Sequence, residues 1–104
     1  MRRVVPTAFP TDPVLADAAA LGAAVRAART AAGMTLADAA LAIGVAKQTL
    51  SDLETARASV GLPLALKVAR ELGVVLFAVP AAQREPLRRW LAASREHAQQ
   101  DGER

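Results

Sequence analysis

Apolar positions along most of this chain are spaced with the period of an α-helix. Between residues 13 and 73 they recur three and four positions apart, as in Leu21, Val25 and Ala28, which would share one helix face. The pattern predicts four helices, over residues 13–32, 35–43, 47–55 and 63–72. Glycine, the residue that most often follows a helix end in the left-handed conformation, comes after three of them, at Gly33, Gly44 and Gly73.

Polar residues mark the beginnings of the first two helices. Asp12, followed by Pro13, and Asp17 are alternative caps for the first helix. Thr35 and Asp38 have the spacing of a capping box at the start of the second.

The run from Val74 to Val79 departs from the helical pattern. It is rich in β-branched residues and bounded by Gly73 and Pro80, which predicts one short strand. A single strand leaves its backbone hydrogen bonds unmade, so it needs a partner strand. Residues 3–5 are another candidate, but pairing with a second copy across a two-fold axis is simpler. The predicted dimerisation residues are Val74, Val75, Leu76, Phe77 and Val79.

The two ends of the chain complete the predicted layout. Prolines interrupt residues 1–12, which should form an arm without helix. Residues 81–104 should form a terminal helix and tail, in which the face around Trp90 packs on its own domain or contacts a partner. The expected divisions are the arm (1–12), a helical domain (13–73), the strand (74–80), and the helix and tail (81–104).

Composition narrows the classes of protein. Of 104 residues, 53% are hydrophobic but only 3% aromatic, which favours closely packed helices. The chain has no cysteine and one histidine, so neither a metal nor another cofactor is expected. No apolar stretch approaches the roughly 20 residues that span a bilayer, and prolines interrupt any signal-peptide core. We expect a soluble, cytoplasmic protein.

The charge is compatible with a nucleic-acid partner but does not require one. The net charge is +3, the sequence pI is about 10.6, and nearly all basic residues are arginine, which suits phosphates and guanine edges. The acidic residues fall where helix caps, solvated faces or an ion pair explain them, and no two are placed for acid–base catalysis. We therefore do not expect an enzyme.

The stretch from Leu36 to Thr55 meets the steric requirements of a helix-turn-helix. Two helices that cross steeply need a small residue where they approach, here Ala40, and a turn residue that tolerates positive φ, here Gly44. The apolar side chains that would fill the wedge between them are Ala39, Ile43, Val45, Leu50 and Leu53. A helical hairpin inside an alanine-rich bundle is the alternative interpretation.

Three segments together resemble the lambda-repressor-like (XRE-type) DNA-binding family. They are RAARTAAGMT at 26–35, AALAIGV at 39–45 and QTLSDLE at 48–54, and the resemblance covers about residues 17–73. It implies a mainly all-α, lambda-repressor-like fold, with the short strand pairing across a dimer and a terminal helix after it. It also implies that the third helix enters the major groove of DNA.

The resemblance implies roles for individual residues. Lys47 and Gln48 would be the leading base readers, with Ser51 one turn further along, because Gln can pair with adenine and Lys can donate to guanine. Candidate phosphate contacts are Thr35, Thr49, Thr55 and Arg57. Arg29 and Glu54 match positions that form a buried ion pair in relatives, so neither should contact DNA.

Three positions depart from the family pattern. Leu36 replaces a glutamine that contacts DNA, Ala46 replaces a hydroxyl cap, and Thr55-Ala56 replaces an Asn-Gly turn. These departures predict fewer base contacts and more reliance on phosphates and DNA shape.

A helix-turn-helix domain that runs directly into a strand is similar to the HipB-like antitoxins of kinase-toxin modules. The expected function is a sequence-specific repressor, acting as antitoxin and autorepressor of a toxin–antitoxin operon in the cytoplasm, at the nucleoid. A stand-alone XRE-type repressor and a protein-interaction module that has lost DNA binding stay open. Expected partners are double-stranded operator DNA, a second copy and, for an antitoxin, a kinase-type toxin; no membrane partner is expected.

Overall fold

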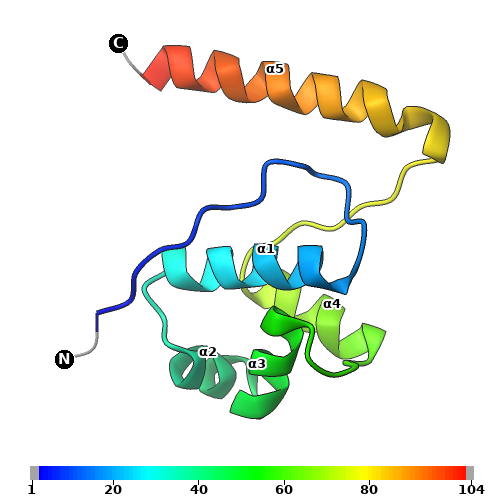
Figure 1. Cartoon of the computed structure of the whole chain (residues 1–104). Helices are drawn as coiled ribbons and strands as arrows, with labels where there is room; N and C mark the ends of the chain where they lie inside the picture. The colour runs from blue at the N-terminus through cyan, green and yellow to red at the C-terminus, as the bar shows by residue number, and fades with distance from the viewer. Residues whose placement is uncertain (1–2, 103–104) are drawn as a thin grey trace. The chain divides into compact units, whose positions relative to one another are not determined.

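The computed structural model describes residues 3–102, which form five α-helices and one 3-10 helix (Figure 1). The elements are α1 (Ala18–Ala31), α2 (Leu36–Ile43), α3 (Lys47–Thr55), α4 (Leu62–Glu71), η1 (Ala81–Gln83) and α5 (Arg84–Gly102). The mainly all-α prediction is confirmed. Residues 1–2 and 103–104, the ends of the expected arm and tail, lie outside the described residues.

The chain falls into two units. The first holds the residues up to Pro10 together with Leu15–Leu76, and thus α1 to α4. The second holds Thr11–Val14 and the residues from Phe77 onward, and thus η1 and α5. The core lies in the first unit and consists of Val25, Ala39, Ala40, Ile43, Leu50, Leu53, Ala65 and Val68. All four helices of this unit contribute to it, as the helical spacing of these residues requires.

The first two helices begin at capped residues. Asp17 caps α1, and its carboxylate accepts a hydrogen bond from the amide of Ala20 at 2.9 Å. Thr35 and Asp38 form the predicted capping box, because the Asp38 amide donates to the Thr35 hydroxyl at 3.0 Å and the Thr35 amide to the Asp38 carboxylate at 3.2 Å. Of the two alternatives for α1, the cap is therefore Asp17 and not Asp12.

The predicted strand over residues 74–80 is wrong for the single chain. The backbone leaves α4 and runs on without helix, but no strand forms anywhere in residues 3–102. A strand exists only through hydrogen bonds to a neighbouring strand, and the chain offers none here. Val74 instead donates its amide to the carbonyl of Ala69 at 2.8 Å, and its side chain packs with those of Ala24 and Ala69.

The second unit joins α5 to residues 11–14. Both oxygens of Asp12 accept from Arg88 at 3.0 Å, and Arg88 also pairs with Glu85. Arg95 donates to the carbonyl of Thr11. Trp90 is 65% exposed. No described helix has the length and hydropathy needed to cross a membrane.

Candidate nucleic-acid interface

The turn at Gly44 gives α3 two different faces. Gly44 has φ 86°, a left-handed conformation that glycine adopts without strain, and it redirects the chain from α2 into α3. Leu50 and Leu53 point into the core, whereas Lys47 and Gln48 are exposed at the start of the helix. The helix is thus anchored by one face and open to solvent on the other.

A buried ion pair ties α3 to α1. Arg29 Nε donates to Glu54 at 2.6 Å, and its terminal nitrogen donates to the other carboxylate oxygen at 2.9 Å. A second terminal nitrogen donates to the carbonyl of Met34 at 2.8 Å. The side chains are only 9% and 3% exposed, so the pair fixes the spacing of the two helices.

The contact of α1 with α3 depends on a glycine that sequence analysis did not single out. A Cβ at Gly22 would lie 2.5 Å from the carbonyl oxygen of Glu54 and closer still to that of Leu53. Only hydrogen fits there, so α1 presses directly against the backbone of α3. A glycine inside a helix pattern was the available signal, because it weakens the helix unless packing requires it.

This geometry agrees with the comparison against known families. A helix-turn-helix family model matches residues 25–76, half of the chain. The chain belongs to the XRE-type helix-turn-helix family. This is a family of DNA-binding regulatory domains and not of enzymes. No curated protein and no solved structure matches the chain.

On the outer face of the helix-turn-helix, Gln48 is held by its neighbour one turn away. Its amide nitrogen donates to the carboxylate of Asp52 at 2.9 Å. The amide keeps its second N–H and its carbonyl oxygen, which are the donor and acceptor that a bidentate contact with adenine uses. Ser51 lies half-buried on the same helix.

The candidate phosphate contacts differ in what their side chains already do. Thr35 accepts from Asp38 and keeps its own hydroxyl proton. The Thr55 hydroxyl already donates its proton to the carbonyl oxygen of Ser51 at 2.8 Å. Thr49 is half-buried in the first turn of α3, and Arg57 is exposed in the loop after it.

The start of α3 lacks a side-chain cap. Ala46 occupies the cap position and makes no side-chain hydrogen bond there. The first amides of a helix point outward and attract anions, and here no side chain of Ala46 competes for them. The missing hydroxyl therefore weakens the helix end but leaves its amides available to a phosphate.

A basic groove lies beside these helix starts. Its lining includes Thr35 and Lys47, two of the predicted contact residues, and also Arg3 and Arg26, which sequence analysis did not assign. Arg26 could have been noticed, because it lies one turn before Arg29 on a helix that contacts α3. Arg3 had no local signal, because nothing in the pattern placed the arm.

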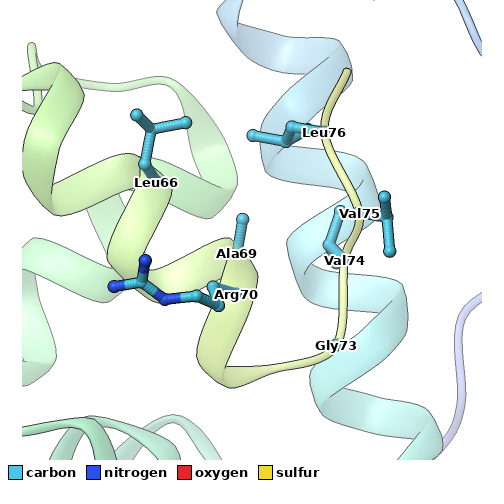
Figure 2. A pocket seen from close by; sticks show the side chains of 7 residues that line it. All are labelled: Leu66, Ala69, Arg70, Gly73, Val74, Val75 and Leu76. Atoms are coloured by element: carbon cyan, nitrogen blue, oxygen red, sulfur yellow. The ribbon is translucent and has the colours of Figure 1, made fainter.

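A second groove, of about 380 Å³, lies between α4 and the segment that follows it. Figure 2 shows Leu66, Ala69 and Arg70 of α4 on one side and Val74, Val75 and Leu76 on the other. Val75 is 80% exposed, and Val74 is buried. The first unit therefore buries Val74 of this segment but leaves the neighbouring Val75 exposed to solvent.

Proposed function

We propose that the protein is a sequence-specific repressor that reads operator DNA as a homodimer. The observation that supports this most is the outer face of α3, where Lys47 and Gln48 are exposed on a helix anchored by Leu50, Leu53 and the Arg29–Glu54 pair. An exposed first turn on a rigidly held helix is what insertion into the major groove requires. Such a repressor would act in the cytoplasm, at the nucleoid.

In this proposal Gln48 is the principal base reader. The bond to Asp52 limits its rotamers before DNA arrives, so less side-chain entropy is lost on binding. Lys47 donates to a guanine or a phosphate, and Ser51 contacts an edge one turn further along. Thr35, Thr49 and Arg57 hold phosphates, whereas Thr55 is the weakest candidate because its proton is already used.

Replacing Gln48 with Ala tests this role. The site is first selected from a pool of randomised duplexes, and binding is measured by fluorescence anisotropy on the selected and on a random duplex. Gln48→Ala should lose about 1–3 kcal/mol on the selected duplex and little on the random one. Gln83→Ala, which removes an exposed amide outside α3, is the matched control. Equal losses on both duplexes would contradict base reading.

We also propose that the homodimer forms through the segment after α4. Val75, Phe77 and Val79 are exposed, and within residues 74–79 the Val74 amide makes the one backbone hydrogen bond that the structure describes. Pairing with the same segment of a second copy would bury these side chains and make the missing bonds. Two recognition helices would then meet half-sites about 34 Å apart.

Sedimentation equilibrium tests the dimer. Val75→Asp places a charge at an exposed position, so the single chain should fold normally while association is abolished. Val75→Thr keeps the β-branched shape and should stay dimeric. A Val75→Asp variant that sediments as a dimer would exclude this segment as the interface.

The finer hypothesis is that the repressor is the antitoxin of a kinase-toxin module. It rests on the resemblance to HipB-like antitoxins and on the order of a helix-turn-helix followed by an apolar segment. An antitoxin should bind and neutralise a kinase-type toxin encoded beside it, which co-expression and co-purification would test. A chain that binds operator DNA but has no such neighbour is a stand-alone repressor.

A further inference from the structure

The basic groove has a volume of about 430 Å³ and is built from three parts of the first unit. The arm supplies Arg3, α1 supplies Arg26, and the starts of α2 and α3 supply Thr35 and Lys47. Figure 1 shows the arm passing along the α1 end that leads towards α2. The groove therefore borders the surface proposed to meet DNA.

The groove carries uncompensated positive charge. Four basic residues line it and no acidic residue does, within the described part of the chain. Arg29 is neutralised by Glu54, but the structure gives Arg3, Arg26 and Lys47 no ion pair among residues 3–98. Three exposed cations around one groove repel one another, and an anion would relieve this repulsion.

The arm is fixed on α1 by a specific contact. The Thr7 amide donates to the Thr30 hydroxyl oxygen at 3.0 Å, and the two hydroxyl groups lie 3.3 Å apart. Thr30 is buried, and its hydroxyl donates a hydrogen bond to the carbonyl oxygen of Arg26 at 2.9 Å. The contact holds the arm beside α1, with Arg3 at the groove.

From this geometry we infer that the groove holds the phosphodiester backbone of the operator, gripped by Arg3 and Arg26 beside Lys47. The inference rests on the proposed function, because Lys47 opens the helix that would enter the major groove. The DNA strand at the edge of the major groove would then pass the starts of α2 and α3. An arginine fork can hold two oxygens of one phosphate, which suits a positioning contact. Arg3 and Arg26 are then positioning residues without sequence preference.

The test is a salt titration of binding to duplex DNA with the full chain. Each phosphate contact contributes about 0.9 to the slope of log K against log salt. Arg3→Ala and Arg26→Ala should each lower this slope by about that amount for every phosphate released, and equally on selected and random duplexes. Arg89→Ala removes the same charge from α5, outside the groove, and should leave the slope unchanged.

A second pair of variants tests the docking of the arm. Thr30→Val removes the acceptor for the Thr7 amide and keeps all charges, whereas Thr30→Ser keeps the hydroxyl. Thr30→Val should reproduce part of the Arg3→Ala effect and add nothing to it in the double variant. Thr30→Ser should bind like the parent chain, and circular dichroism verifies that both variants are folded.

The possible failures can be distinguished. If the parent chain binds no duplex, the proposed function itself is wrong. If it binds with a steep slope that Arg3→Ala and Arg26→Ala leave unchanged, only the groove inference is wrong. A third measurement uses a deoxynucleoside monophosphate. If Arg3→Ala weakens the binding of this compound without altering the duplex slope, the basic groove binds a free phosphate compound and the inference is overturned.

Discussion

The helix-turn-helix unit and the second unit are held together by different forces. The first buries a continuous apolar core and an ion pair that joins α1 to α3. In the second, no side chain described from Phe77 to Ala98 is buried. Among its described residues, Arg88 and Arg95 make long-range hydrogen bonds with residues 11–14, and these bonds are solvent-exposed.

The difference shows which part of the protein is stabilised by burial within a single copy. Burial and the ion pair fix α3 inside one copy, so the geometry of the face proposed to meet DNA does not depend on assembly. The long-range hydrogen bonds described in the second unit are exposed, and water and salt weaken such contacts. Phe77, Val79 and Trp90 stay exposed there, and an association that covered them would add the burial this unit lacks.

The largest expected effect comes from breaking the ion pair in the first unit. Glu54→Ala leaves the Arg29 guanidinium buried with the Met34 carbonyl as its remaining acceptor. We expect it to lower the free energy of unfolding by about 3–5 kcal/mol, measured by urea denaturation.

A double variant separates the loss of the pair from the cost of the stranded charge. Arg29→Met combined with Glu54→Leu removes both charges and refills the volume, so it should be much closer to the parent than Glu54→Ala. If Glu54→Ala unfolds at the parent's urea midpoint, the pair does not hold α1 on α3 and the contrast between the units is overstated.

The close approach at Gly22 should give the next largest effect. Gly22→Ala forces α1 away from the Leu53 and Glu54 carbonyls, which we expect to cost about 1–3 kcal/mol or more in urea denaturation. Gly61→Ala is the matched control, because its Cβ would meet nothing closer than 3.9 Å. Similar urea midpoints for both variants would mean that the helices can separate freely.

The sequence predicted those parts of the fold that depend on local signals. The turn at Gly44 and the capping box of Thr35 with Asp38 involve residues within a few positions of each other. The approach at Gly22 and the pairing of Asp12 with Arg88 join distant segments, so no window of sequence contains both partners. The strand was predicted from composition, but its hydrogen bonds need a neighbour that one chain lacks.

The candidate site divides in the same way. The outer face of α3 followed from helical spacing, and the pairing of Arg29 with Glu54 came from the family resemblance. The Gln48–Asp52 bond lies within one helical turn and could have been predicted from its four-residue spacing. The placement of Arg3 depends on how Thr7 docks on α1, which only the folded chain shows.

A smaller effect of opposite sign is expected at the end of α3. Ala56 has φ 55°, a left-handed conformation that costs an alanine about 1–2 kcal/mol. Ala56→Gly removes this strain but adds chain entropy to the unfolded state, so we expect a net stabilisation of about 0.5–1 kcal/mol. Ala58→Gly, in the loop that follows, should be neutral or slightly destabilising. A destabilised Ala56→Gly variant would show that the first unit tolerates this turn without strain.

The smallest effect is expected in the second unit, at Asp12. Hydrogen bonds from Arg88 and from the Val14 amide hold the pKa of this carboxyl below its ordinary value of 3.8. Because the folded pKa is depressed, any stabilisation by this group is present above pH 3.8 and is lost as the pH falls through the lower folded value. An NMR titration should show the depressed pKa, and Arg88→Gln should raise it towards 3.8.

At neutral pH, Asp12→Asn should leave the melting of the first unit unchanged, since both side chains are solvated. If Asp12→Asn instead lowers the Tm of the helix-turn-helix unit, the two units do not fold independently, and the contrast between a buried and an exposed mode of stabilisation fails.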